Sequence, residues 1–378
     1  MKMLMLATTA AMIEQFNKNN ILLLEEMGYE VHVAGNFLQG NPISEERLDA
    51  FKHWLDEHHG KWFNLPSTRK PWDFKGNGRA LKIVTELIND NQYDFIHCHT
   101  PLGSVIGRIA AHRTGTKIIY TAHGFHFYNG APLKNWLMYY PVERFLSRWT
   151  DVLITINEED YKRAIEKFHA GKTVYIPGIG VDTKKYAPEN TAIIRENKRK
   201  EIGVPENARL LISVGELIER KNHKAVVRAL QNLPDDYWYV IVGKGELRDE
   251  LMELDKTGHL ILLGFRTDIR ELLWSSDLFV FPSVQEGLSV ALMEAMSAGL
   301  PCIVSKIRGN TDLIKDEDLL FEPNDVQRIG RLIESTLAGN GINNENRVSE
   351  IKESNLTEIR DYDCELIQSL MKEIYKNI

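Results

Sequence analysis

Short apolar runs alternate along the chain with longer segments in which apolar residues recur every three or four positions. The short runs are typical of buried strands, and the longer spacing is typical of helices that pack one face on a core. Ten strands are predicted in two series: Met3–Leu6, Val31–Ala34, Phe95–His97, Ile118–Thr121 and Val152–Ile156, then Leu210–Val214, Tyr239–Val242, Leu260–Leu263, Leu278–Phe281 and Cys302–Ser305. The helices predicted between them include Ala80–Asn89, Trp136–Trp149, Ala225–Leu230 and Ala291–Ala298.

This alternation predicts an α/β protein. Strands that are apolar throughout are typical of parallel sheets covered by helices on both faces. A single sheet rarely has so many strands, so we expect two doubly wound, Rossmann-like domains. Pro and Gly interrupt the pattern at Pro177–Asp182, which predicts domains at 1–182 and 183–356 and a helical terminal segment at 357–378.

The composition and charge exclude several classes of protein. The 378 residues are 43% hydrophobic and 26% charged, as in ordinary globular domains. The net charge of -7 argues against a general nucleic-acid binder, and three cysteines are too few for a disulfide framework. No apolar run is long enough to cross a bilayer, so we expect a cytoplasmic protein. Residues 1–182 hold 20 cations and 20 acids, so the excess acid lies in the second half.

The strongest candidate for chemistry follows the predicted strand that ends at Phe281. Ser289 is placed to cap a helix, and the backbone N–H groups around it favour a bound phosphate. Glu286 precedes this helix end, and Glu294 lies a little over one turn into the helix. Two acids flanking an anion site suit the hydroxyl groups on either side of a diphosphate. Alternatively, both are solvated residues at the start of a helix.

Two further segments also follow predicted strands. Gly215 permits a turn, and the adjacent cations Arg220 and Lys221 suit a diphosphate leaving group, unless they are an ordinary surface pair. His123 follows a strand of the first series, and it is either a site residue, a structural histidine or, with His126, a zinc ligand. No acid or cysteine is spaced to complete such a zinc site. Neither a P-loop nor a G-x-G-x-x-G turn after the first strand is found.

Together, these three segments resemble the family 4 retaining glycosyltransferases of the GT-B fold, in the branch that builds bacterial capsule and exopolysaccharide. The segment Glu286 to Glu294 is similar to that family's E-x7-E motif, and Thr121–His126 is similar to its His-Gly loop. The resemblance implies that two Rossmann-like domains face each other across a cleft. The first domain then holds the acceptor, the second holds the nucleotide-sugar, and the segment 357–378 crosses back to the first.

The resemblance also implies a role for each site residue. Glu286 would hold hydroxyl groups of the donor sugar, Glu294 those of the ribose, and His123 would contact the sugar. Arg220 and Lys221 would stabilise the leaving diphosphate, which itself takes the acceptor's proton, so that neither a metal nor a cofactor is required. The other implied donor contacts are Gly215, Phe265, Arg266, Gly287, Leu288, Ser289 and Val290.

Two positions depart from the family pattern. The loop after the first strand, commonly Gly-Gly, reads Thr8-Thr9-Ala10-Ala11-Met12 here. The segment from Gly215 to Lys221 is similar to the family's donor-diphosphate motif. The first cation of that motif is replaced here by Glu216, and Arg220 is the residue expected to supply the missing charge.

The predicted function is transfer of a hexosyl or N-acetylhexosaminyl group from a UDP-sugar, with retention. The resemblance implies an undecaprenyl-diphosphate-linked saccharide as acceptor and a role in surface polysaccharide biosynthesis. The alternatives are a nucleotide-sugar epimerase of the same fold and a non-catalytic sugar-binding protein. No nucleic-acid partner is expected.

Two segments of the first half predict peripheral docking on the anionic inner face of the plasma membrane. The first, residues 61–82, carries one acid, Asp73, and interleaves cations with Trp62, Phe63, Trp72 and Phe74. Its six cations are Lys61, Arg69, Lys70, Lys75, Arg79 and Lys82. The second, Lys134–Tyr140, includes Trp136. Alternatively, these aromatic residues belong to the core.

Overall fold

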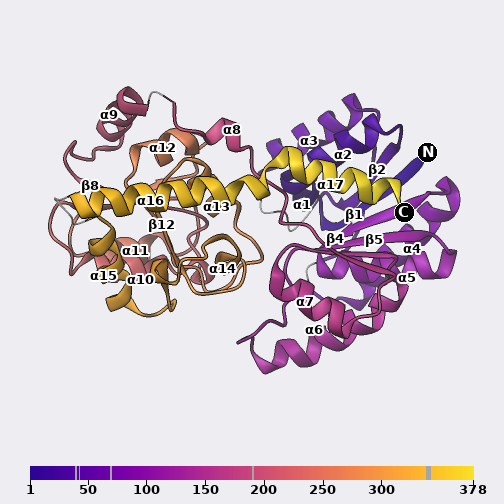
Figure 1. Ribbon diagram of the computed structural model, residues 1–378. Helices are drawn as coiled ribbons and strands as arrows, with labels where there is room; N and C mark the ends of the chain where they lie inside the picture. Colours follow the sequence, from indigo (N-terminus) through magenta and orange to yellow (C-terminus); the bar gives the residue numbers. More distant parts are fainter. Residues whose placement is uncertain (39–40, 42, 69, 190, 338–341) are drawn as a thin grey trace. The chain divides into compact units, whose positions relative to one another are not determined.

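A computed structural model describes residues 1–38, 41, 43–68, 70–189, 191–337 and 342–378 of the chain (Figure 1). The chain forms two compact units, one of residues 1–179 and 367–378 and one of residues 180–366. The division therefore falls three residues before the position predicted from the sequence. Each unit is built on one parallel sheet, so the predicted fold class of two doubly wound α/β domains is confirmed.

The first unit contains a seven-stranded sheet in the order β3-β2-β1-β4-β5-β6-β7. Its strands are β1 (Lys2–Thr9), β2 (Glu30–Asn36), β3 (Lys61–Asn64), β4 (Phe95–His99), β5 (Lys117–Ala122), β6 (Val152–Thr155) and β7 (Lys172–Tyr175). Its helices are α1 (Ala10–Phe16), α2 (Lys18–Glu26), α3 (Glu45–Glu57), α4 (Phe74–Asn91), α5 (Pro101–Thr114), α6 (Leu133–Leu146), η1 (Ser147–Trp149) and α7 (Glu158–Lys167). The strand order reverses at β1, which places a ligand-binding switch point at the carboxyl ends of β1 and β4.

The second unit contains a six-stranded sheet in the order β10-β9-β8-β11-β12-β13. Its strands are β8 (Arg209–Val214), β9 (Tyr237–Val242), β10 (Leu260–Gly264), β11 (Leu278–Phe281), β12 (Cys302–Ser305) and β13 (Leu320–Phe321). Its α-helices are α8 (Thr183–Tyr186), α9 (Thr191–Ile202), α10 (His223–Leu230), α11 (Arg248–Leu254), α12 (Ile269–Ser275), α13 (Val290–Ser297), α14 (Asn310–Leu313), α15 (Val326–Leu337) and α16 (Ile342–Glu358). Three 3₁₀ helices complete it: η2 (Glu219–Lys221), η3 (Glu317–Leu319) and η4 (Ile359–Tyr362). The order reverses between β8 and β11, and the loops after these two strands carry the predicted donor motifs.

All ten predicted strands are present, and three short strands were not predicted. Two of these, β3 and β7, form the edges of the first sheet and are only partly buried, so they lack an apolar run. The third, β13, has two residues and is too short for any periodicity to show.

The sequence predicted one helical segment at 357–378, but the structure divides it. Helix α16 ends at Glu358, η4 follows, and a new helix, α17 (Cys364–Lys376), begins after Asp363. The carboxylate of Asp363 accepts hydrogen bonds from Thr183 Oγ1 and from the Glu365 N–H, which holds the chain in an extended conformation between the helices.

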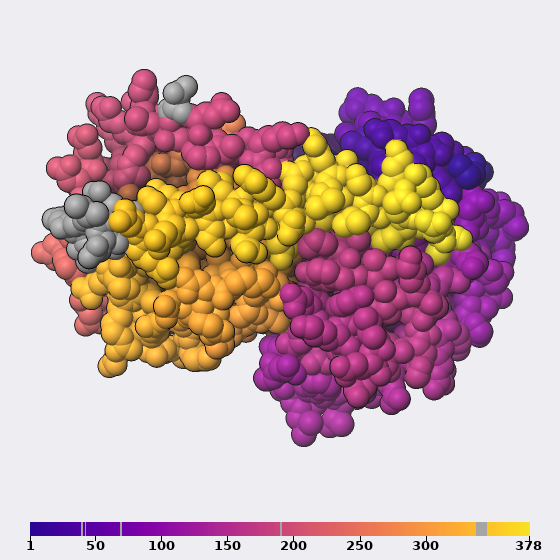
Figure 2. All heavy atoms as spheres, in the orientation of Figure 1, coloured from indigo at the N-terminus to yellow at the C-terminus, as the bar shows by residue number. Residues whose placement is uncertain are grey.

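Helix α17 completes the core of the first unit. Its apolar side chains, Ile367, Met371, Ile374 and Tyr375, are buried together with residues of β1 and β4 such as Met3 and Phe95. The Tyr375 hydroxyl lies 2.9 Å from Nδ1 of His97 in β4. Figure 2 shows α17 (yellow) on the surface of this unit.

Candidate active site

The predicted donor residues lie at the carboxyl edge of the second sheet, on two loops. One loop follows β8 and contains η2 with Arg220 and Lys221. The other follows β11 and leads into α13. The Val284 N–H donates to the Arg220 carbonyl at 2.9 Å, and the Asn222 side chain donates to the Pro282 carbonyl at 3.1 Å. The two loops are therefore joined, and the motifs, over 60 residues apart in sequence, form one site.

Three side chains converge on one oxygen of Glu286. Oε1 accepts hydrogen bonds from Lys221 Nζ at 2.8 Å, Arg220 Nη1 at 2.8 Å and Ser283 Oγ at 2.6 Å. Burial would raise the pKa of Glu286, but the charges of Lys221 and Arg220 outweigh burial and lower it below its usual value. Glu286 is therefore ionised at neutral pH, and the cluster of one acid and two cations carries a net positive charge.

Gly215 gives Lys221 the space it occupies. A Cβ at Gly215 would meet Cε of Lys221 at 3.2 Å, closer than most real contacts. The ammonium group of Lys221 lies 4.9 Å from the centre of the Phe281 ring. The sequence predicted a turn at Gly215, and the structure adds a steric reason for a residue without a side chain.

Ser289 caps α13, as predicted. Its hydroxyl accepts a hydrogen bond from the Leu292 N–H at 3.3 Å. The preceding residues, Gly287 and Leu288, lie beside the N-terminal end of the helix, where backbone N–H groups and the helix dipole favour an anion.

Two residues that the sequence analysis did not identify hold this loop in place. Arg308 donates from Nε to the Glu286 carbonyl at 3.2 Å. Gly309 has φ +78°, and a Cβ there would overlap the carbonyl oxygen of Gly287. Both residues lie after β12. The only feature of the sequence that could have identified them is a glycine shortly after a predicted strand.

Glu294 is positioned by a tyrosine that the sequence analysis also missed. The Tyr186 hydroxyl, at the end of α8, donates to Oε1 of Glu294 at 2.6 Å. Burial raises the pKa of Glu294, and the hydrogen bond from Tyr186 and the charge of Lys185 partly oppose this. Tyr186 is far from the motif in sequence, so no local pattern could have connected the two residues.

Phe265 and Arg266, the predicted contacts to the base, follow β10. The Phe265 side chain is exposed. The guanidinium of Arg266 pairs with Asp268 at 2.6 Å and with Glu201 at 2.5 Å, and these hydrogen bonds raise its pKa. Phe265 therefore offers a free aromatic surface, whereas Arg266 is held by two acids.

In the first unit, His123 lies at the carboxyl edge of β5 beside His99 of β4. Nε2 of His123 is 3.2 Å from Nδ1 of His99. His97 lies behind them and contacts Thr121 Oγ1 at 2.8 Å and the Tyr375 hydroxyl at 2.9 Å. Burial lowers the pKa of His123 to about 4 and that of His97 to about 3, so both imidazoles are neutral near pH 7. In the part of the chain that the structure describes, no group of three His, Cys, Asp or Glu residues is arranged to hold a metal ion.

The predicted loop at Thr8–Met12 is absent, because β1 runs to Thr9 and α1 begins at Ala10. Thr8 forms side-chain hydrogen bonds at the position where the family commonly has Gly-Gly. Its hydroxyl lies 2.8 Å from the Thr100 hydroxyl and accepts the Gly103 N–H at 3.1 Å. The threonine therefore joins the ends of β1 and β4 at the switch point.

The predicted membrane residues differ in exposure. Trp62 packs against Phe37 with ring centres 5.0 Å apart, and Trp136 packs against Phe127 at 5.7 Å. Trp72, Lys70 and Lys75 are exposed. Arg69 lies outside the described residues.

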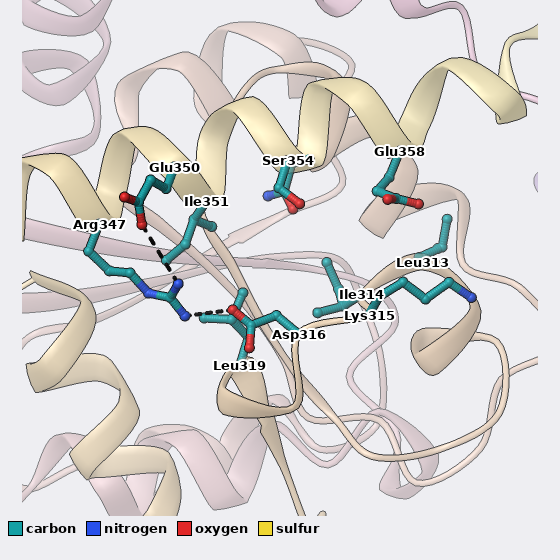
Figure 3. A pocket seen from close by; sticks show the side chains of 11 residues that line it. Leu313, Ile314, Lys315, Asp316, Leu319, Arg347, Glu350, Ile351, Ser354 and Glu358 are labelled. Atoms are coloured by element: carbon teal, nitrogen blue, oxygen red, sulfur yellow. Dashed lines mark hydrogen bonds and ion pairs between the residues drawn. The ribbon is translucent and has the colours of Figure 1, made fainter.

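A pocket of about 200 Å³ lies elsewhere in the second unit, between α16 and the segment Leu313–Leu319 (Figure 3). Arg347 at its edge pairs with Asp316 at 2.5 Å and lies 3.9 Å from Glu350. None of the predicted donor residues lines it. The pocket is therefore separate from the candidate active site.

Comparison with known families matches both units. Residues 14–185 match the family described as Glycosyltransferase Family 4, and residues 194–354 match Glycosyl transferases group 1. The second match contains the cluster around Glu286 and the helix with Glu294.

Among individual proteins, EpsD of Bacillus subtilis (strain 168), whose glycosyltransferase name is provisional, is 37% identical over 347 residues, 88% of this chain and 86% of EpsD. An Escherichia coli protein named UDP-Gal:alpha-D-GlcNAc-diphosphoundecaprenol alpha-1,3-galactosyltransferase is 36% identical over 264 residues, 66% of this chain and 67% of that protein. The crystal structure of Anabaena Alr3699/HepE in complex with UDP-glucose has the same fold, with a TM-score of 0.78, 19% identity and full coverage of both chains.

Proposed function

Because the chain belongs to the family 4 and group 1 glycosyltransferases, we propose that it transfers a hexosyl or N-acetylhexosaminyl group from a UDP-sugar to a lipid-linked saccharide, with retention. The observation that carries this proposal is the cluster of Glu286 with Arg220 and Lys221 beside the N-terminal end of α13. This arrangement combines positive charge for a diphosphate with a carboxylate for sugar hydroxyls.

The chemistry of the donor side follows from charge. Cleavage of the sugar–phosphate bond leaves negative charge on the diphosphate and positive charge on the sugar ring. Arg220, Lys221 and the helix end lie in fixed positions to stabilise the leaving diphosphate. In this proposal the two cations do the work that a metal ion does in other enzymes. The leaving phosphate accepts the proton of the acceptor hydroxyl on the same face, which gives retention.

We propose the remaining donor contacts from the family resemblance. Glu286 accepts hydrogen bonds from hydroxyl groups of the sugar, and Glu294 accepts them from the ribose. Phe265 stacks on the base. His123, neutral at pH 7, offers a ring nitrogen to the sugar without adding a charge.

For the acceptor, we propose an undecaprenyl-diphosphate-linked saccharide used in surface polysaccharide biosynthesis. The support is the Escherichia coli relative, whose name specifies a diphosphoundecaprenol acceptor. Within the described part of the chain, no helix combines the length and apolar content that crossing a bilayer demands. Peripheral association with the inner face of the plasma membrane would bring such an acceptor to the first unit.

One experiment separates this function from the alternatives. Thermal shift with UDP-, GDP- and ADP-sugars identifies the donor, because a ligand that binds the folded state stabilises it. The stabilising donor is then incubated with and without a saccharide-diphosphate-prenol acceptor. We expect product only with the acceptor, and with the anomeric configuration of the donor. A new sugar nucleotide formed without acceptor would indicate an epimerase, and no response to any donor would indicate a non-catalytic protein.

A further inference from the structure

Helix α6 of the first unit has an apolar face that no described residue covers. Five of its side chains are between 42% and 73% exposed: Leu133, Leu137, Met138, Val142 and Phe145. Successive members are one, three or four residues apart, and at about 3.6 residues per turn all five fall within one half of the helix circumference. Figure 1 places α6 at the outer edge of this unit.

A groove continues this apolar face toward α5. It has a volume of about 550 Å³, and its lining is mostly apolar: Val105, Ile109, His112, Arg113, Pro141, Val142, Phe145, Leu146 and Trp149. A contiguous exposed apolar patch is typical of a binding surface, whereas single exposed apolar side chains are not.

The exposed charges that α6 and its flanking segments contribute are all positive. Residues 101–150 contain a single acid, Glu143. Its carboxylate is buried and pairs with Arg108 at 2.8 Å, so it presents no negative charge to the outside. Four exposed cations surround the face: Arg113, Lys134, Arg144 and Arg148. Beyond these residues, α7 brings the acids Glu159 and Glu166 beside Trp136 and Tyr140 of α6, together with Lys162, Arg163 and Lys167, so the surroundings of the face remain mainly cationic. An apolar face bordered mainly by cations is complementary to an anionic leaflet, where side chains insert among the acyl chains and cations meet the headgroups.

We propose that α6, with its groove, is the element by which this protein docks on an anionic membrane. This inference rests on the proposed function and replaces residues 61–82 as the principal contact. In that segment Trp62 is packed against Phe37, and Lys61 and Lys82 pair with Glu30 and Glu86. Helix α6 also begins next to the loop that carries His123, because the Asn135 side chain donates to the His126 carbonyl at 3.0 Å. Docking through α6 therefore brings a membrane-bound acceptor to the side of the first unit that carries His123.

Co-sedimentation with vesicles tests this inference. The double variant Leu137→Gln, Phe145→Gln removes two exposed apolar side chains and should leave the fold intact. A matched variant, Trp72→Gln, Phe74→Gln, makes the same change in the 61–82 segment, and Ile193→Gln is the control in the second unit, where Ile193 is 71% exposed. We expect the parent protein to bind phosphatidylglycerol-containing vesicles at least tenfold more tightly than phosphatidylcholine vesicles. Only the α6 variant should lose at least tenfold of that affinity.

Donor binding and transfer to a short-chain, water-soluble acceptor are measured on the same proteins. Normal values for the α6 variant support a docking role, and absent activity in the parent would count against the proposed function alone. Undiminished vesicle binding by the α6 variant overturns the inference, as does equal binding to neutral vesicles. Sedimentation velocity gives a third outcome. If the parent protein dimerises and the α6 variant does not, the inference is also overturned, because the apolar face would then be covered by a second copy of the chain.

Discussion

Arg220 and Lys221 differ in how completely the protein encloses them, although both donate to the same oxygen of Glu286. The Lys221 side chain is 12% exposed and packs over Phe281, whereas that of Arg220 is 39% exposed. Lys221 is therefore the more strongly oriented of the two charges. Arg220, nearer to solvent, is held less completely by the protein.

We expect Arg220→Ala and Lys221→Ala each to lower turnover by about 10²-fold, because in the proposed reaction each removes a positioned charge that stabilises the leaving diphosphate. The loss should be larger for Lys221→Ala, which also removes a buried partner of Glu286. Steady-state kinetics measure both. Arg248→Ala, at an exposed cation paired with Asp249, is the matched control and should retain parental turnover. If Arg220→Ala is as active as the parent, Arg220 does not replace the cation absent at Glu216.

Tyr186→Phe should weaken UDP binding and make it more sensitive to acid. Burial already raises the pKa of Glu294, and the hydrogen bond from Tyr186 opposes that rise. Loss of the hydroxyl should raise this pKa further, so the carboxylate that we propose accepts hydrogen bonds from the ribose hydroxyls is protonated at a higher pH. Loss of a hydrogen bond to a charged group costs about 1.5–3 kcal/mol. Calorimetric titration with UDP at several pH values between 5 and 8 measures the affinity and the pH at which half of it is lost.

Glu294→Gln is the companion variant for that titration. It should bind UDP weakly, because the charged acceptor is missing. The affinity should also be the same at every pH, because the amide does not titrate. Identical pH profiles for Tyr186→Phe and the parent would show that the tyrosine does not control Glu294.

Among the elements, the central strands and the capped helix could be predicted from sequence, and the edges and breaks could not. Strands β1, β4, β8 and β11 are buried on both faces, so their apolar runs show directly in the sequence. The break at Asp363 depends on a hydrogen bond from Thr183, a residue remote in sequence, so a local pattern there predicts one continuous helix. The same limit applies to the site: the acids and cations lie in local motifs, whereas Tyr186, Arg308 and Gly309 act through tertiary contacts.

Gly309 gives the clearest test of how the loop after β12 supports the active site. Gly309→Ala places a methyl group on the Gly287 carbonyl at a φ of +78°, so the segment around Glu286 must move. We expect UDP binding at least tenfold weaker and a lower thermal midpoint. Gly330→Ala is the matched control, because Gly330 lies inside α15 with open space around it. That change should raise stability by about 0.5–1 kcal/mol and leave binding unchanged. Parental UDP affinity in Gly309→Ala would contradict the supporting role.

At the scale of the whole molecule, the two units differ in their buried histidines. In the first unit, burial lowers the pKa of His32, His97, His99 and His123, and in the described part of the second it lowers only that of His223. These rings are neutral in the folded state and near their usual pKa of about 6.5 when unfolded. As pH falls below that value, the unfolded chain takes up protons that the folded chain does not, so stability falls until the folded pKa is reached.

The first unit should therefore lose more stability than the second between pH 7 and pH 5. Each such histidine contributes up to about 1.4 kcal/mol for each pH unit below 6.5. Urea unfolding at each pH, followed by a hydrogen-exchange pulse at one fixed pH and mass spectrometry, gives the unfolded fraction of each unit separately. His97→Gln should reduce the acid sensitivity of the first unit only. His53→Gln, at a histidine whose side chain is 77% exposed, should leave it unchanged. Equal losses in both units would show that carboxylates rather than buried histidines set the acid limit of this fold.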